Sequence, residues 1–511
     1  MGSNMPDFHL HHQFPLRHFV LVCAIVLMQA SCAVGPDFAK PESEAPANWT
    51  DWRSADNELH TPFGSTAELS AEWWRMFGDP VLDRLEQRAF EASPDVHTAA
   101  LHFAQARVQH SMVAAQRGPE ISVGGDVSRQ SQSENNAGMR IIDAIGADRD
   151  ALAKILSEPF NLYQAGFDAS WEPDLWGRIG RSVEAADADI ANQAALLDMA
   201  RLSLASDVAR TYFEFRTTQR LIRLVRDDIE ALKDRVAILE ARVQGGTIDH
   251  LDLERQRAEL SGIKAQLPGL LAQEGASANQ IALLLGERPG ALRSELAAPA
   301  EATTAVLPAL GLGVPSEVAL RRPDIRAAEA RLHRATARIG IARADLYPSI
   351  RLGANFGYES YLSGEFSDWG SQTWSVGASL DLPLFDNGRR KSVVTLRELE
   401  QQEAAVNYQQ TVLKAWQEID DAISGYTAEQ QQALELEARL RSASLAYELT
   451  QARYKGGTVD FIAVLDSQRG YLQARLDLTS SQGRVNTRYV MVNKSIGNVL
   501  TDVGMAKVTA K

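Results

Sequence analysis

Four segments of the chain alternate apolar and polar residues with the two-residue period of a β-strand. They cover roughly residues 119–130, 162–173, 348–359 and 373–383. The clearest apolar face consists of Ile350, Leu352, Ala354, Phe356 and Tyr358. Strands of about ten residues with one apolar face and aromatic residues near their ends are typical of membrane barrels. A soluble sandwich with one buried face would show the same alternation and is the open alternative.

One chain cannot close such a barrel. In a bilayer every backbone polar group needs a partner, and a closed barrel needs about eight strands. The four strands must therefore combine with those of further copies, as eight strands in a dimer or twelve in a trimer. The strand count does not choose between the two assemblies.

Long helical patterns follow the second and the fourth strand. Each spans about 66 residues, over 178–243 and 389–455, which is roughly 100 Å at 1.5 Å per residue. The first contains a coiled-coil seam with spacings of four and three, made by Val225, Ile229, Leu232, Val236, Leu239 and Val243. Helices of this length are typical of coiled coils and exceed those of globular domains.

Each long helix ends at a glycine pair, where the chain turns back. The residues at the two turns are Gly245, Gly246 and Thr247, and Gly456, Gly457 and Thr458. The threonines are expected to cap return helices over 247–286 and 458–497. Shorter helices over about 81–117 and 316–346 supply the remaining length of each half. The pattern predicts an elongated tube with strands at one end and helical turns at the other.

The two halves of the chain repeat one another. The matching stretches, in the same order in both halves, are Pro94-Asp95-Val96 with Pro323-Asp324-Ile325, Pro119 with Pro348, and Arg242–Asp249 with Arg453–Asp460. This predicts structural repeats over 81–300 and 301–500, an N-terminal segment over 32–80 that wraps a collar, and a tail over 501–511. A polar insertion over 131–161 lengthens the first repeat.

The N-terminus resembles an export signal. An apolar run from Phe19 to Met28 follows Arg17, and Gln29-Ala30-Ser31-Cys32 follows the run. Small residues before a cysteine resemble a lipoprotein signal, which predicts a signal peptide over 1–31 and a covalent lipid such as palmitate on Cys32. The alternative is an ordinary secretory signal with an incidental cysteine.

Composition narrows the function classes. The net charge is −14, so no basic surface for nucleic acid is expected. Two cysteines make neither a disulfide scaffold nor a cysteine zinc site. Only the N-terminal run approaches a bilayer span, which excludes a bundle of transmembrane helices. No Walker A, HExxH or GxSxG motif occurs, so we expect no enzyme, no cofactor and no metal.

Six stretches resemble the outer-membrane efflux factors, the TolC-like family, and especially its NodT/OprM-like lipoprotein branch. They are Cys32–Pro41, Trp73–Pro80, Trp171–Arg178, Arg321–Glu329, Leu382–Arg389 and Arg453–Gln468. The resemblance implies a mixed α+β membrane protein and a homotrimer. Its twelve-stranded outer-membrane β-barrel, with four strands per chain, would continue into a periplasmic α-helical coiled-coil barrel with an equatorial collar.

The same resemblance implies a function. The chain would be the passive exit duct of a tripartite efflux pump, set in outer-membrane lipid. It would dock onto a periplasmic adaptor and an inner-membrane pump of the resistance-nodulation-division type, and carry drugs or other small toxic molecules. A duct for type I protein secretion is the alternative with the same fold. A periplasmic coiled-coil scaffold without a pore is the alternative from another class, and the amphipathic strands argue against it.

The helical tip is the expected gate. Ile462 and Asp466 are four residues apart and share a helix face. This resembles the family's constriction, an apolar side chain with an aspartate one turn away in each subunit. Carboxylates around a narrow axis attract cations. The alternative for Asp466 is a surface ion pair with Arg469.

The other hairpin contributes a further gate candidate. Asp252 matches a family position in the interaction network of the closed state, although Leu251 precedes it where the best-known member has a polar residue. Asp249 and Asp460 could instead cap helix N-termini. The glycines and threonines at the two turns are candidate adaptor contacts, and the alternative is that tight turns simply need glycine.

Overall fold

The computed structural model describes residues 33–41, 56, 59, 72–135, 144, 146, 148–297, 315, 318 and 321–498. Two compact units interleave along the chain, one comprising residues 1–39, 108–188 and 333–403, the other residues 40–107, 189–332 and 404–511. The predicted signal peptide, Cys32 and the predicted tail lie outside the described residues. Of the helices that the structure describes, none combines the length and the apolar character needed to cross a membrane.

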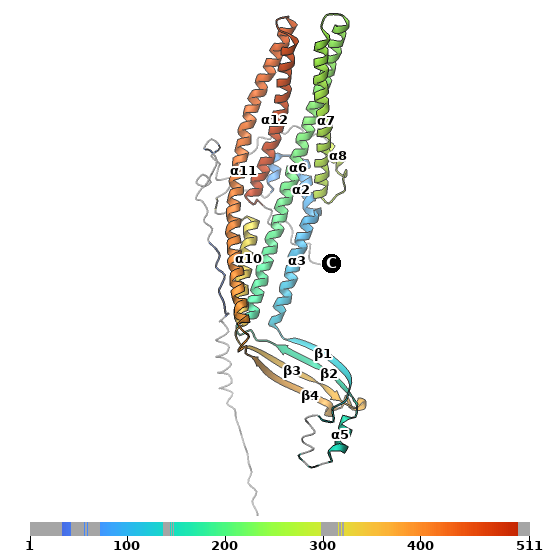
Figure 1. Cartoon of the computed structure of the whole chain (residues 1–511), viewed down its shortest axis with the longest axis vertical. Coiled ribbons are helices and arrows are strands. Elements are labelled where there is room, and N and C mark those ends of the chain that lie inside the picture. Colours follow the sequence, from blue (N-terminus) through green and yellow to red (C-terminus); the bar gives the residue numbers. More distant parts are fainter. Residues whose placement is uncertain are drawn as a thin grey trace, which may run out of the picture. The chain divides into compact units, whose positions relative to one another are not determined.

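The first unit contains a four-stranded antiparallel sheet (Figure 1). The strands are β1 Glu120–Gln130, β2 Phe160–Trp171, β3 Ser349–Ser360 and β4 Gln372–Asp381. The alternating segments of the sequence coincide with these strands. The order is β1-β2-β3-β4, so β1 and β4 are edge strands, and within the described chain each pairs on one side only.

The register gives this sheet one apolar and one polar face. One row across the four strands consists of Val123, Phe167, Phe356 and Trp374. The adjacent row consists of Ser122, Asp168, Asn355 and Ser375. Val123 and Trp374 are 71% and 72% exposed, so the described residues leave the apolar face uncovered. This argues against a soluble sandwich, in which a second sheet would bury that face.

The long helices α6, α7, α11 and α12 pair into hairpins (Figure 1). The first pairs α6 Arg178–Gln244 with α7 His250–Leu284, and the second pairs α11 Arg389–Lys455 with α12 Phe461–Ser495. The shorter helices are α2 Pro80–Ala92, α3 Pro94–Ala114, α5 Arg149–Ser157, α8 Arg293–Ala297 and α10 Pro323–Ala344. Both hairpins consist of a 67-residue and a 35-residue helix, the lengths expected if the two halves repeat one another.

The predicted coiled-coil seam of α6 is buried in the second unit. Val225, Ile229, Leu232, Val236 and Leu239 belong to one apolar cluster with Leu253, Leu260 and Ile263 of α7 and with Phe461, Val464 and Leu465 of α12. Val243, at the end of the seam, is partly buried against the same cluster. The seam prediction is confirmed. Burying one large aliphatic side chain contributes about 1.5–3 kcal/mol, so this cluster is a main source of cohesion between the two hairpins.

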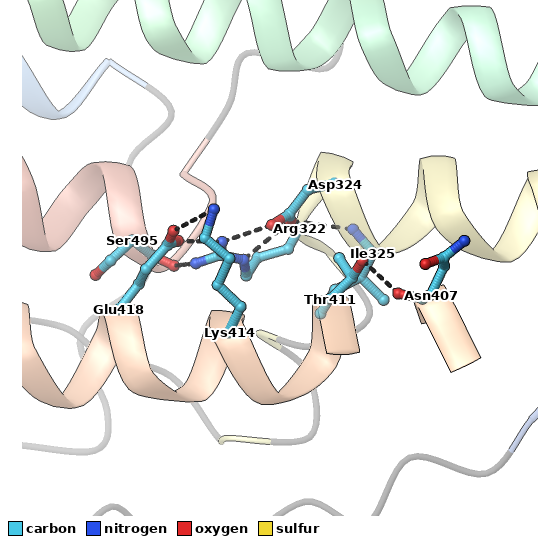
Figure 2. Close-up of polar contacts among 8 residues, drawn as sticks. All are labelled: Arg322, Asp324, Ile325, Asn407, Thr411, Lys414, Glu418 and Ser495. Carbon is cyan, nitrogen blue, oxygen red and sulfur yellow. Dashed lines mark hydrogen bonds and ion pairs between the residues drawn. The ribbon is translucent and has the colours of Figure 1, made fainter. Parts of the chain in front are cut away.

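Arg322 braces three helices of the second unit. It is buried just before α10 and forms ion pairs of 2.6 Å with Asp324 and with Glu418 of α11. It also donates a hydrogen bond to the carbonyl oxygen of Ser495, the last residue of α12 (Figure 2). A guanidinium charge complements the partial negative charge of a helix C-terminus. The Arg-Arg-Pro-Asp stretch therefore has a structural role here.

A buried acid lies in the larger apolar core of the second unit. Glu86 of α2 is fully buried, and neither carboxylate oxygen has a hydrogen-bond partner in the described structure. Its helix neighbours Leu82, Leu85 and Ala89 are fully buried too. Burial raises the pKa of Glu86 well above its ordinary value, and the nearby Asp83 raises this pKa further. The folded protein therefore holds a proton on Glu86 at pH values where the unfolded chain releases it.

We expect Glu86→Gln to stabilise the protein increasingly as the pH rises. Above the ordinary glutamate pKa of about 4.3 the unfolded wild type gains by ionising, so its stability falls by up to about 1.4 kcal/mol per pH unit until the raised folded pKa is reached. An amide cannot ionise. Thermal melts followed by circular dichroism should give the variant a Tm advantage that grows with pH and vanishes toward about pH 4.

The matched control is Glu91→Gln, because Glu91 is exposed on the same helix. This control should melt like the wild type at every pH. An advantage of Glu86→Gln that does not depend on pH would contradict the buried-proton explanation.

Candidate functional site

The two hairpins end in turns with the same hydrogen bonds. At the first turn the N–H of Thr247 donates to the carbonyl oxygen of Arg242, and the N–H of Gly246 to that of Val243, both over 2.9 Å. The second turn repeats these bonds over 3.0 Å, from Thr458 to Arg453 and from Gly457 to Tyr454. This pattern is the Schellman motif, which ends helices. The φ angles of Gly246 and Gly457 are +67° and +72°, so the turn itself requires glycine there.

The threonines at the turns do not cap the return helices, and that prediction is wrong. The hydroxyl of Thr247 donates back to the carbonyl oxygen of Arg242 over 2.9 Å, and that of Thr458 to the carbonyl oxygen of Arg453 over 3.1 Å. The reason is the place of each threonine in the turn. Each threonine still belongs to the hydrogen-bonded turn that closes the preceding helix, so its side chain serves that helix.

The caps of the return helices are Asp249 and Asp460, as the alternative interpretation held. Their backbones are extended, and α7 and α12 begin at the next residues. The Asp249 carboxylate accepts a hydrogen bond from the N–H of Leu251 over 3.3 Å, and the Asp460 carboxylate accepts one from Ala463 over 3.1 Å. An N-cap of this kind contributes about 1 kcal/mol to a helix.

The predicted gate residues Ile462 and Asp466 lie one turn apart on α12, near the second turn. Both side chains are exposed, and Ile462 is 41% exposed. The residues around them, Phe461, Val464 and Leu465, are buried in the seam cluster. The helix therefore presents one apolar side chain and one carboxylate on a face that the rest of the described chain leaves free.

The alternative partner of Asp466 is occupied elsewhere. Arg469 donates from Nε to Oε2 of Glu259 on α7 over 2.6 Å. Among the described residues Asp466 has no ion-pair partner, so the interpretation of Asp466 as half of a surface pair with Arg469 is wrong in this structure. Arg469 pairs with Glu259 on the other hairpin and not with Asp466, its neighbour three residues away on the same helix.

Asp252 sits in the first turn of α7. Its side chain is 25% exposed, and its Oδ1 lies 3.7 Å from a guanidinium nitrogen of Arg255. It therefore occupies the hairpin opposite Ile462 and Asp466 with its charge partly offset by a neighbour. Its assignment to the gate stays a prediction.

Polar links between the two hairpins were missed by sequence reasoning. Arg235 of α6 donates to Gln468 of α12 over 2.7 Å and also to the hydroxyl of Tyr447 on α11 over 2.5 Å. Asp228 of α6 accepts from Arg475 of α12 over 2.7 Å. The partners are 212 to 247 residues apart in sequence, so no local pattern reveals them. Any separation of the hairpins in one chain has to break these bonds.

The start of the described chain docks in the first unit. The N–H of Val34 donates to the carbonyl oxygen of Trp176 over 3.1 Å, and Asp37 forms a 2.7 Å ion pair with Arg181. A side chain at Gly177 would lie 2.9 Å from Ala33, so the absence of one allows this close approach. Ala33 therefore lies beside the connection from β2 to α6.

Comparison with known proteins gives consistent matches. The family model described as "Outer membrane efflux protein" matches residues 85–287 and 314–498. The pyoverdine export outer membrane protein OpmQ of Pseudomonas putida is 30% identical over 434 residues, which are 83% of this chain and 89% of OpmQ. Nodulation protein T of Rhizobium leguminosarum bv. trifolii is 25% identical over 483 residues, 94% of this chain and 97% of that protein.

Solved structures agree with the sequence comparisons. The structure of the outer-membrane channel OprN matches with a TM-score of 0.81 and 28% identity, over 92% of this chain and 100% of that chain. A TM-score of this size over nearly the whole length means that the two chains share one fold.

Proposed function

Because the chain belongs to the outer membrane efflux protein family, we propose that it is the exit duct of a tripartite efflux pump. Like its relatives, it is an outer-membrane efflux channel and not an enzyme. The finer proposal is a passive duct that carries drugs or other small toxic molecules to the outside. An inner-membrane pump, of the resistance-nodulation-division type, and a periplasmic adaptor would deliver them.

The observation that carries this proposal is a sheet that the described residues leave with two open edges and an uncovered apolar face. In a bilayer each unpaired backbone N–H or C=O group costs several kcal/mol, so an open strand edge is not tolerated. Pairing β4 of one copy with β1 of the next removes both edges. Three copies would form a twelve-stranded barrel with lipid on the apolar face and a water-filled duct along the polar face.

The proposed gate is the ring that Ile462 and Asp466 would form at the helical tips of three copies. Its support is the exposure of both side chains and the lack of a cation beside Asp466 among the described residues. Three carboxylates around one axis favour cations over anions, and the isoleucines narrow the opening. Opening would require the tips to move apart.

Asp466→Asn should weaken the cation preference of the channel. The purified protein in planar lipid bilayers would be tested by the reversal potential in a potassium chloride gradient, with the wild type preferring potassium. The matched control is Asp477→Asn on the same helix, because Asp477 is already neutralised by Arg439 at 2.7 Å. Asp252→Asn should have a smaller effect than Asp466→Asn. An unchanged reversal potential in Asp466→Asn would remove Asp466 from the gate.

The proposed partner contacts are the two turns at the tips, made by Gly245, Gly246 and Thr247 and by Gly456, Gly457 and Thr458. All six residues are exposed in the described chain. The cargo is proposed from relatives, since OpmQ is named for pyoverdine export and SrpC of Pseudomonas putida for solvent efflux. Both are small molecules, which favours efflux over type I protein secretion.

A photo-crosslinking residue at position 247 or 458 in living cells tests this function. We expect capture of the periplasmic adaptor of a proton-driven small-molecule pump, identified by mass spectrometry. The same probe at Glu91, which is exposed on α2, should not capture it. Capture of an adaptor of a protein-export system would mean that the cargo is protein and not small molecules. Capture of no adaptor would mean that the docking site does not lie at the tips.

A lipid on Cys32 is proposed from the sequence and from the docked segment that follows it. Ala33 lies beside the connection from β2 to α6, at the helix-side end of the sheet. The membrane surface would lie at this level if the strands span the bilayer. An acyl chain on Cys32 could then enter the inner leaflet without unfolding the docked segment.

Cys32→Ser should abolish incorporation of an alkyne-labelled palmitate supplied to growing cells. Cys23→Ser is the matched control and should incorporate it fully, because Cys23 lies within the predicted signal peptide. The wild type should carry the label in the outer-membrane fraction. An unlabelled wild type would favour the ordinary secretory signal.

A further inference from the structure

The connection from β4 to α11 carries the two most exposed large apolar side chains among the described residues. Leu384 is 87% exposed and Phe385 is 85% exposed. They follow Pro383 and precede Asp386, whose carboxylate accepts a hydrogen bond from the N–H of Arg390 and so fixes the start of the helix. The turn is therefore well formed, yet no other described residue covers its apolar side chains.

The equivalent connection in the first half, from β2 to α6, is covered by the chain itself. Trp176 stacks on Tyr347 with ring centroids 4.8 Å apart, and its Nε1 donates to the carbonyl oxygen of Pro348 over 2.6 Å. Tyr347 and Pro348 lie in the connection from α10 to β3. The first half thus supplies a template for the second. In this template, the connection from a strand to the following long helix packs against the connection that leads into the neighbouring strand.

This template encloses a hollow of 460 Å³ with walls from three connections. It is lined at β2–α6 by Glu172 to Trp176 and Arg178, and at α10–β3 by Ala342, Ala344, Asp345 and Tyr347 to Arg351. At β4–α11 it is lined by Asp381, Arg389, Arg390 and Val393. The central wall is the connection into β3, which has a strand neighbour on each side. The connection into β3 is therefore flanked on one side by the connection that follows β2 and on the other side by the connection that follows β4.

The connection into β1 has a hollow of the same kind with one flanking wall missing. This hollow measures 560 Å³. It is lined at α3–β1 by Met112, Ala115, Gln116 and Gly118 to Glu120, at β2–α6 by Ser170 to Glu172, Arg178 and Ile179, and by Arg351. Pro119 is the repeat equivalent of Pro348, and Gly118 is that of Tyr347. Because β1 is an edge strand, the missing wall lies across the open edge of the sheet.

We infer that Leu384 and Phe385 of a second copy of this chain close the hollow beside Gly118 and Pro119. By the repeat, the missing wall is a β4–α11 connection, and the chain's own β4 is at the far edge of its sheet. The inference rests on the proposed function, in which β4 of one copy pairs with β1 of the next. It adds the side chains that lock that junction.

The chemistry of the hollow suits these two side chains. Met112 is 62% exposed, Trp171 is 40% exposed, and together with Pro119 they offer apolar surface. Gly118 has no side chain where the second half has the ring of Tyr347, and a Cβ there would meet only one atom, at 3.8 Å. The space that Tyr347 fills in the second half is thus open for Phe385. Burial of one such aromatic side chain contributes about 1.5–3 kcal/mol.

A cysteine pair tests the junction in the purified full-length protein. Met112→Cys combined with Phe385→Cys, treated with a short bis-maleimide, should give a covalent species of three times the monomer mass on a denaturing gel. Either single variant should remain at the monomer mass. As a positive control for reach, Trp176→Cys with Tyr347→Cys should crosslink within one chain, with the bridge found by peptide mass spectrometry and no gain in chain number.

The outcomes separate this inference from the proposed function. A double variant that is trimeric by native mass spectrometry but does not crosslink, while the positive control does, overturns the junction and leaves the channel standing. A wild type that is not an oligomer at all overturns the proposed barrel and the junction together.

A charge in the junction provides an independent test. Phe385→Asp should lose the trimer, because an unpaired carboxylate would be buried in an apolar hollow. Trp369→Asp is the matched control, since Trp369 is 81% exposed at the other end of the sheet and lies outside the proposed junction. Retention of the trimer by Phe385→Asp would mean that Phe385 faces lipid or water and would overturn the inference.

Discussion

The constraint on which the rest depends is that a membrane offers no hydrogen bonds to an open strand edge. The described part of the chain has four strands in sequential order, with β1 and β4 at the edges. Its register presents apolar side chains on one face and polar side chains on the other. In the proposed barrel further copies would close these edges, and the same closure would separate lipid from water. The connections at the strand ends would then meet across each junction, so the order of strands would determine which side chains pack there.

Within the second unit, apolar and polar contacts between the hairpins have different consequences. The seam of α6 with α7 and α12 supplies cohesion but little directional preference, since apolar surfaces tolerate small sliding movements. The hydrogen bonds that Arg235 donates to Gln468 and Arg475 donates to Asp228 have fixed distances and partners. They specify one arrangement of the hairpins. A gate built on such hairpins can stay assembled while its polar contacts change.

Much of the fold follows from periodicity alone. The alternation locates the strands, and the spacing of Val225 to Val243 locates the buried seam, because both patterns reflect which face is covered. Contacts between side chains far apart in sequence do not follow. The caps are a local example, since Thr247 and Asp249 both have cap chemistry and only backbone geometry decides between them. Glu86 shows another limit, because its sequence neighbours do not reveal that an acidic side chain lies in the core.

Arg469 shows how one distant contact sets the charge of the candidate gate. On a helix it lies three residues from Asp466, within reach of that carboxylate. In the structure its guanidinium is held by Glu259 of the other hairpin, so among the described residues no cation pairs with the exposed Asp466. A neighbour on the same helix would have neutralised the carboxylate. The acid on α7 therefore does two things at once, joining the hairpins and leaving a free negative charge beside Ile462, and both follow from a single ion pair.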